Sequence, residues 1–174
     1  MKKLEEYVVS IPDFPKPGII FRDVTSVLQD ADALKMAIDG LCDMLKDVDF
    51  DVVAGPEARG FIFAVPVAYA LGKPFVPFRK PGKLPREVIR ETYELEYGSE
   101  TIEIHKDAIK HGQKVVIVDD LLATGGTVAA DIRLIERLGG EVVKVCFVME
   151  LEGLEGRKAL KGYDVESIIK YPGK

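Results

Sequence analysis

The chain has 174 residues, with 24 Lys or Arg, 29 Asp or Glu and a formal charge of −5 at pH 7. This length predicts a single domain with a sizeable core, and the acidic balance argues against a nucleic-acid partner, because nucleic acids are bound by clustered cations. No apolar run reaches 18 residues and no leader-like segment opens the chain, so we expect a cytoplasmic protein without a membrane partner.

The cysteines and histidines do not form a recognisable metal or disulfide pattern. Cys42 and Cys146 are too few for a disulfide framework and lack the Cys-x-x-Cys spacing. We interpret both as buried reduced thiols. His105 and His111 have no partner at metal-ligand spacing, so we interpret them as surface histidines and predict no metal ligands from the protein.

The first elements in the chain predict a connector and then a helix. A short helix over residues 2–9 is followed by a Pro- and Gly-rich extended connector at 11–18 and a short strand at 19–24. Asp32 is placed to cap the next helix. Its predicted apolar stripe, which we interpret as purely structural, comprises Leu34, Ala37, Ile38, Leu41 and Leu45.

A strand at 51–54 then leads into the turn at 55–60, Gly-Pro-Glu-Ala-Arg-Gly, and a helix over 61–71. Because a helix N-terminus favours an anion and Arg59 adds a guanidinium, this turn is a candidate anion site.

After a strand at 74–78, residues 79–86 are rich in Lys and Arg. Their Pro and Gly residues predict a loop that is able to move over a site.

Residues 91–97 and 101–105 alternate in polarity, which predicts an antiparallel hairpin joined at 98–100. We expect a short helical turn at 106–110. Further on, a strand at 141–149, a short helix at 157–160 and an edge strand at 164–169 complete the chain. The predicted fold class is α/β, a single-domain open, mostly parallel twisted sheet with helices on both faces and ligands at the carboxyl ends of its strands.

The most informative stretch is residues 115–127. Four β-branched residues at 115–118 predict a strand buried on both faces. Gly125 and Gly126 then lead into a helix that Thr124 or Thr127 could cap and that Gly139-Gly140 ends. The turn can direct successive N–H groups, together with the helix dipole, at one anion, for which phosphate is the natural candidate.

Two carboxylates, Asp119 and Asp120, directly precede this turn. Since carboxylates repel phosphate, they must serve a neighbouring group such as sugar hydroxyls or Mg²⁺. A ribose 5-phosphate satisfies both requirements. The chain lacks GxxxxGK[ST] and has no GxGxxG after a strand, so neither common nucleotide motif applies.

Residues 119–127, Asp-Asp-Leu-Leu-Ala-Thr-Gly-Gly-Thr, resemble the signature of the type I phosphoribosyltransferases, which bind 5-phosphoribosyl 1-pyrophosphate (PRPP). The variant is similar to that of the members that use adenine, and the resemblance continues back to residues 14–18. It implies one domain over 1–174 with the type I phosphoribosyltransferase fold. It also implies a hood at about 11–25 and a flexible loop at about 80–100.

The resemblance implies transfer of the phosphoribosyl group to N9 of adenine, a purine salvage reaction that gives AMP and pyrophosphate. It also implies a homodimer and Mg²⁺ held by PRPP and water. The implied contacts are Ala123, Thr124, Gly125, Gly126 and Thr127 for the 5-phosphate; Asp119 and Asp120 for the ribose hydroxyls; Glu57, Ala58, Arg59, Arg79, Lys80, Lys83 and Tyr97 for pyrophosphate; and Ile20, Phe21 and Arg22 for adenine. A cis Glu57–Ala58 peptide is typical of this family.

The implied catalytic residues are Glu96, Arg59 and Lys83. Many relatives acting on 6-oxopurines carry an acid where this chain has Ala123, so the purine proton must be managed from elsewhere. Glu96, in the family's Leu-Glu-Tyr-Gly pattern at 95–98, is the best-placed group to hold the N7 proton while N9 attacks. Arg59, Lys83 and Mg²⁺ would stabilise the departing pyrophosphate.

Three alternatives remain open on sequence grounds. The base could be another purine, since backbone groups around residues 20–22 can donate or accept. The chain could be a PRPP-sensing regulator, although it lacks a DNA-binding extension or a basic face. Residues 115–127 could also be an ordinary strand, turn and helix with two exposed acids. The sequence does not decide which of Asp119 and Asp120 contacts the ribose.

Overall fold

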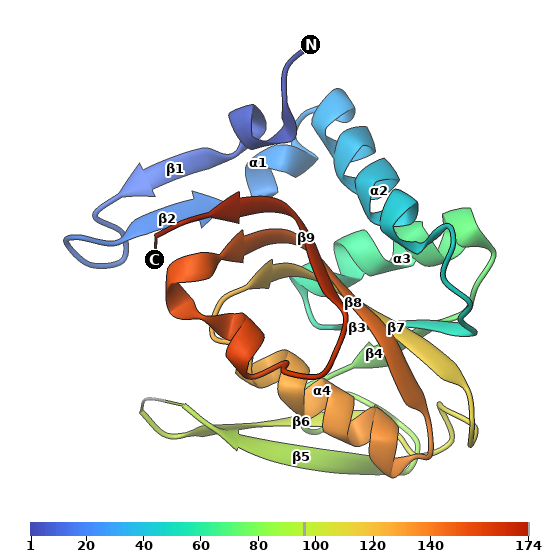
Figure 1. The fold of residues 1–174 in the computed structure, drawn as a ribbon. Coiled ribbons are helices and arrows are strands. Elements are labelled where there is room, and N and C mark those ends of the chain that lie inside the picture. The colour runs from blue at the N-terminus through green and yellow to red at the C-terminus, as the bar shows by residue number, and fades with distance from the viewer. Residues whose placement is uncertain (96, 174) are drawn as a thin grey trace.

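A five-stranded parallel sheet forms the centre of the fold (Figure 1). The computed structural model describes residues 1–95 and 97–173. The strands lie in the order β4-β3-β7-β8-β9, which confirms the predicted α/β class. Their bounds are β3 Val52–Pro56, β4 Phe75–Phe78, β7 Lys114–Leu122, β8 Glu141–Leu151 and β9 Val165–Tyr171.

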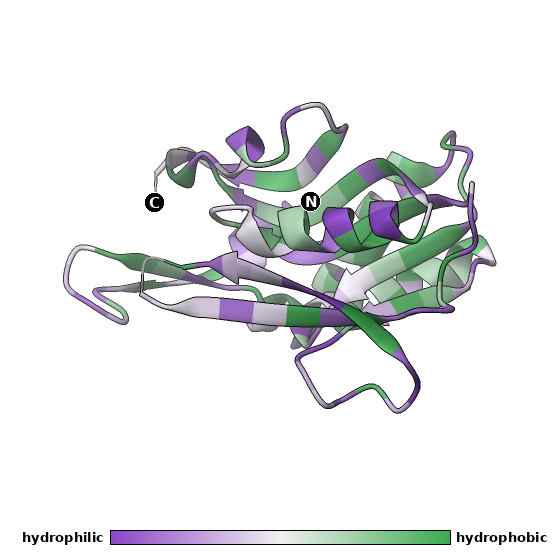
Figure 2. Cartoon of the chain, turned by 90° about the horizontal axis from the view of Figure 1, so that it is seen from below, coloured by the Kyte–Doolittle hydropathy of each residue, from purple (hydrophilic) through white to green (hydrophobic). Residues whose placement is uncertain are grey.

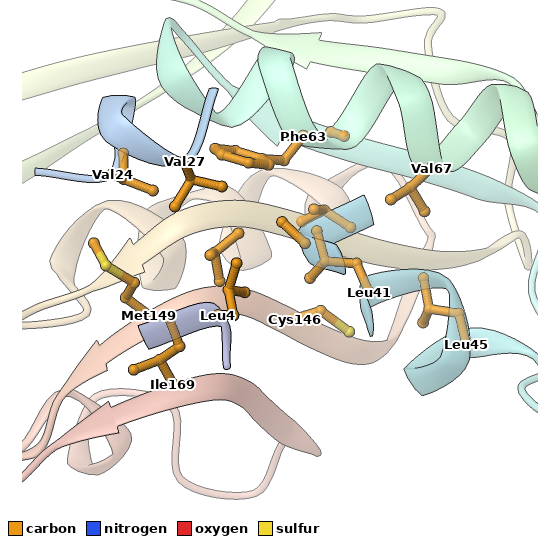
Figure 3. Packing of buried hydrophobic residues seen from close by; sticks show 14 of the residues in the cluster. Leu4, Val24, Val27, Leu41, Leu45, Phe63, Val67, Cys146, Met149 and Ile169 are labelled. Carbon is orange, nitrogen blue, oxygen red and sulfur yellow. The ribbon is translucent and has the colours of Figure 1, made fainter. Parts of the chain in front are cut away.

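Helices cover both faces of this sheet. On one face, α2 (Ala31–Leu45) and α3 (Arg59–Leu71) pack over a core that includes Val116 and Val118. Figure 3 shows side chains of this core, among them Leu41 of α2 and Phe63 of α3. On the other face, α4 (Gly126–Arg137) packs over Val115 and Ile117. Successive residues of β7 therefore point into the two cores on opposite faces of the sheet. This explains why the strand is apolar at every position instead of alternating between apolar and polar residues.

A two-stranded hairpin, β5 (Val88–Glu94) and β6 (Ser99–His105), lies alongside α4 on that second face. Figure 2 views the molecule from this side and shows polar and apolar segments along the strands. The inward residues Tyr93, Ile102 and Ile104 join the core beneath α4. The predicted antiparallel hairpin is confirmed, but its turn is misplaced, because β5 ends at Glu94 and residues 99–100 belong to β6. The expected helical turn at 106–110 is wrong, because residues 106–109 form turns and bends.

The N-terminal segment forms a small layer, the hood, whose Leu4, Val24 and Val27 pack in the core shared with α2 and α3. It contains the short helix η1 (Leu4–Tyr7), the antiparallel strands β1 (Val9–Pro12) and β2 (Ile20–Asp23), and the single-turn helix α1 (Thr25–Leu28). The prediction that 11–18 is an extended connector without a regular element is wrong at its start, because β1 includes Ile11 and Pro12. Pro12 is tolerated since β1 is an edge strand.

The predicted cap of α2 is also wrong. Asp30, not Asp32, accepts the N–H groups of Asp32 and Ala33 at 2.9 and 3.0 Å. Because Asp30 is the better-placed cap, the helix begins at Ala31 and Ala33 joins its buried stripe with Ala37, Leu41 and Leu45. Leu34 and Ile38 are only half-buried.

The remaining predicted elements are close to the observed ones. The short helix η2 (Glu152–Leu154) precedes η3 (Gly156–Lys158), and β9 is an edge strand as expected. Cys146 is buried and Cys42 is half-buried, and both are free thiols. Among residues 1–95 and 97–173, no helix combines the length and the apolar character that a bilayer span requires.

Candidate functional site

The two glycine-bearing turns meet in one cavity. They follow β3 and β7, which are neighbours in the parallel sheet, so their carboxyl ends lie at the same edge. The cavity has a volume of about 260 Å³ and is lined by residues 56–60 and 119–128. The structure thus brings together the pyrophosphate, ribose and 5-phosphate residues predicted from Glu57 to Arg59 and from Asp119 to Thr127.

The N-terminus of α4 faces this cavity with free donors. Gly125 is the N-cap, with φ +84°, and its carbonyl accepts the N–H of Ala129 at 2.9 Å. The N–H groups of Gly126, Thr127 and Val128 precede the first intrahelical bond. No side chain in the described part of the chain caps this helix, so the prediction that Thr124 or Thr127 caps it is wrong. An anion is therefore the natural partner of these donors.

Gly125 is required by packing as well as by backbone angle. A Cβ at this position would lie 2.7 Å from the carbonyl oxygen of Gly156. Gly156 belongs to η3, which is fixed by a bidentate ion pair from Arg157 to Glu150 at 2.8 and 2.9 Å. No sequence pattern indicates this contact, because residues 125 and 156 lie on separate elements.

The two aspartates of β7 differ in their surroundings. Oδ1 of Asp119 accepts the N–H of Asp120 at 2.8 Å. Burial, and next the charge of Asp120, raise the pKa of Asp119 well above its ordinary value. Oδ2 of Asp120 lies 2.8 Å from Nε of Arg59, although the angle makes this an ion pair rather than a hydrogen bond. The guanidinium of Arg59 thus balances charge at Asp120.

The turn after β3 has the cis Glu57–Ala58 peptide that the resemblance implied. Burial alone would raise the pKa of Glu57, but the N–H of Lys80 at 2.7 Å and the guanidinium of Arg79 at 3.1 Å outweigh it and lower that pKa. Glu57 therefore ties the start of the cationic loop to this turn.

A second cavity of about 210 Å³ adjoins the first. It contains Arg79 and Lys80, two of the predicted pyrophosphate residues, and shares Glu57 and Thr127 with the first cavity. Its wall also includes Tyr93 and Glu100, which no sequence motif indicated. The available signal was the alternating hairpin pattern, in which these two residues are cross-strand partners.

Several predicted residues lie outside both cavities. Lys83 and Tyr97 are exposed, and Ile20, Phe21 and Arg22 belong to the hood strand β2. Glu96 lies outside the residues that the structure describes.

The hood side chains are engaged with one another and with β9. The guanidinium of Arg22 lies 4.1 Å from the Tyr171 ring centroid and donates to Oγ of Ser10 at 2.6 Å. The ring of Phe21 meets that of Phe14 edge-on with centroids 5.3 Å apart. Tyr171 and Ser10 thus engage the face and Nη1 of the Arg22 guanidinium, whereas its Nε is buried without a hydrogen-bond partner among the described residues.

The interpretation of His105 as a surface residue is wrong. The side chain lies at the end of β6 with only 8% exposure. Its Nδ1 lies 3.2 Å from Nη2 of Arg86, and its Nε2 accepts the N–H of Arg86 at 3.4 Å. His105 therefore holds the end of the cationic loop against the hairpin.

Asp131, one turn into α4, is fully buried, and neither carboxylate oxygen has a hydrogen-bond partner in the described part of the chain. Burial raises its pKa well above the ordinary value. The folded chain therefore keeps this carboxyl neutral at pH values where the unfolded chain ionises it. Stability is lost as pH rises from the unfolded pKa towards the folded one, by up to about 1.4 kcal/mol per pH unit.

We therefore expect Asp131→Asn to change the pH dependence of stability. The free energy of unfolding of the variant, relative to the parent, should increase between pH 5 and pH 8, because Asn cannot ionise. Urea unfolding at both pH values measures this difference, and the pH 5 pair is the control for any constant effect of the amide. A constant difference across this range would contradict a neutral Asp131.

Comparison with known proteins agrees with this geometry. A family model described as the phosphoribosyl transferase domain matches residues 25–171. The adenine phosphoribosyltransferase of Lachnoclostridium phytofermentans is 68% identical over 174 residues, which are 100% of both chains.

Solved structures give the same result. The crystal structure of adenine phosphoribosyltransferase from Thermoanaerobacter pseudethanolicus has a TM-score of 0.93 and 56% identity, covering 97% of this chain and 100% of that one. The Saccharomyces cerevisiae enzyme, complexed with an imino-altritol bisphosphate and adenine, has a TM-score of 0.88 and 41% identity over 95% and 96% of the two chains. The chain therefore belongs to the phosphoribosyl transferase family and, within it, to the adenine phosphoribosyltransferases.

Proposed function

We propose that this protein transfers the 5-phosphoribosyl group of PRPP to N9 of adenine, giving AMP and pyrophosphate. The observation that carries this proposal is the shared cavity, in which the free N–H groups of α4 lie beside two buried aspartates. An anion site next to hydroxyl acceptors suits a phosphorylated sugar. The yeast relative was solved with a bisphosphate and adenine together.

We assign the two ends of PRPP to the two turns. Residues 123–127 would hold the 5-phosphate, and residues 57–59 would hold the pyrophosphate at the neighbouring strand end. Arg79, Lys80 and Lys83 would approach the pyrophosphate from the cationic loop, whose start is fixed by Glu57. Catalysis would then come from stabilising the leaving group and from holding the base in line with the ribosyl carbon.

The base would lie against the hood. Ile20 is 41% exposed and Phe21 is half-buried, which leaves apolar surface for a purine ring. Backbone groups near Arg22 would form hydrogen bonds with the edge of the purine, and Glu96 would hold the N7 proton. Tyr97 would contribute to the pyrophosphate side.

We propose Mg²⁺ as the cofactor, held by PRPP oxygens and water. In residues 1–95 and 97–173, no group of three or more His, Cys, Asp or Glu is arranged to hold a metal ion. Asp119 and Asp120 offer oxygen acceptors to the waters of the bound ion rather than direct ligands. When bound, the ion would neutralise charge on the departing pyrophosphate.

Replacing Asp119 by Ala should weaken PRPP binding far more than adenine binding. The carboxylate lines the cavity beside α4, and its loss removes an acceptor for the ribose hydroxyls, typically about 1–3 kcal/mol. Isothermal titration with each ligand measures the two affinities, and Asp120→Ala is the companion variant. Equal losses for PRPP and adenine would argue against a ribose contact from Asp119.

We further propose a homodimer that uses α3. Ile62, Val65 and Tyr69 are 41%, 45% and 89% exposed and recur at helical spacing. An exposed apolar stripe of this kind favours a protein interface. Sedimentation equilibrium should give twice the chain mass of 19.2 kDa, and a single-chain mass at micromolar concentration would contradict the proposal.

One assay tests the function directly. Purified protein, Mg²⁺ and PRPP are offered adenine, hypoxanthine, guanine and xanthine in turn, with nucleotide and pyrophosphate measured. We expect AMP and pyrophosphate in equal amounts from adenine. Faster turnover of an oxopurine would reassign the base, and no turnover with any of them would favour a PRPP-sensing role.

A further inference from the structure

Tyr93 connects the 5-phosphate turn to the hairpin that carries Glu96 in the sequence. Its side chain is only 8% exposed, and its ring lies beside Gly126, where an added Cβ would be 3.5 Å away. Its hydroxyl donates to Oε2 of Glu100 at 2.8 Å and lies 2.8 Å from Oγ1 of Thr127. Tyr93 and Glu100 are direct cross-strand partners.

Glu100, Tyr93 and Thr127 form a hydrogen-bonded series in which each hydroxyl has one proton to donate. Burial raises the pKa of Tyr93 to about 12, so the phenol keeps its single proton at neutral pH. That proton is donated to Glu100. The contact between Tyr93 and Thr127 must then use the hydroxyl proton of Thr127, which consequently points away from the anion site.

Binding of a phosphate would reverse this arrangement. For Thr127 to donate to a phosphate oxygen, its Oγ1 has to accept from Tyr93 instead. Tyr93 has only one proton, so it must then release Glu100. No proton leaves its oxygen in this change; two hydroxyl groups rotate.

The tip of the hairpin is well placed to respond to phosphate binding at Thr127. Away from its tip, it is fastened to α4 by Glu91, which pairs with Arg133 at 3.1 Å and Arg137 at 3.2 Å. Tyr93 is the next inward residue towards the tip and contacts the first turn of α4. Glu100 is exposed on the facing strand, so water can take over from the phenol.

We propose that Tyr93 is a positioning residue that passes occupancy of the 5-phosphate site to the hairpin, by switching its hydrogen bond from Glu100 to Thr127. This inference rests on the proposed 5-phosphate role of residues 123–127. It assigns opposite effects to two neighbouring residues. Tyr93 supports the phosphate-bound arrangement, and Glu100 competes with it.

The test measures binding of ribose 5-phosphate, which has the phosphate and ribose but undergoes no transfer. We expect Tyr93→Phe to weaken binding roughly three- to tenfold, because Thr127 loses its donor. Glu100→Ala should instead tighten binding roughly two- to fivefold, because the phenol proton is already free to turn to Thr127. Titration calorimetry gives both values.

The double variant separates this mechanism from simple charge removal. If Glu100 acts through Tyr93, Glu100→Ala should leave affinity unchanged in the Tyr93→Phe background. A gain that persists there would show that the carboxylate acts by repulsion alone and would overturn the proposal.

Thr92→Val is the matched control, since it removes a 2.8 Å bond to Thr101 on the same two strands without touching either cavity. Its affinity should equal that of the parent, and thermal unfolding checks that every variant is folded. Glu100→Ala changes an exposed residue, so it tests the proposal even if Tyr93→Phe folds poorly. If the parent protein does not bind ribose 5-phosphate, the proposed function is overturned too. If the parent binds it and the variants bind it with the same affinity, only the proposed role of Tyr93 is overturned.

Discussion

Replacing Gly125 by Ala should lower kcat/KM for PRPP by about a hundredfold or more. The residue has φ +84°, which disfavours any side chain, and its Cβ would lie 2.7 Å from the backbone oxygen of Gly156. The turn must shift to relieve that contact, and a displacement near 1 Å at a binding group can cost about a hundredfold in rate. Steady-state kinetics with varied PRPP measures the effect.

Gly162→Ala is the matched control for backbone strain. Gly162 has φ +94°, but no atom of residues 1–95 or 97–173 lies within 4 Å of its added Cβ, and it lines neither of the two cavities. The left-handed backbone angle alone should cost each variant about 1–2 kcal/mol of stability, yet only Gly125→Ala should lose activity. Similar kinetics for the two variants would mean that the position of the turn is not critical to PRPP use.

The second large effect is expected for Glu96→Gln, with kcat reduced about 10²- to 10⁴-fold and PRPP binding retained. Gln keeps the size of Glu but cannot accept a proton, so only the step that needs an acid or base is affected. The family pattern at 95–98 motivates this role. In addition, Tyr93 and Glu100, which flank Glu96 in the sequence, line the cavity that contains Thr127.

Single-turnover kinetics and PRPP titration measure the two quantities separately. Glu94→Gln is the control, because Glu94 is an exposed acid at the end of β5 and no motif assigns it a role. Unchanged turnover in Glu96→Gln would remove this residue from the mechanism.

Local patterns predicted most of the fold correctly. The run at 115–118, the glycine turns and the alternating hairpin each depend on preferences within a few residues. The errors occurred where competing local signals were close together, as with Asp30 and Asp32 before α2. They also occurred where a distant partner decided the outcome, as with His105, which is buried against Arg86.

The sequence by itself determined the fold class, the family and the residues of both glycine turns, because a phosphate turn is encoded in one continuous segment. Only the tertiary structure decided that Arg59 pairs with Asp120, that Gly156 packs on Gly125, and that Tyr93 joins Thr127 to Glu100. These contacts connect residues on separate elements. Their geometry depends on how the strands and helices pack, and no local periodicity records it.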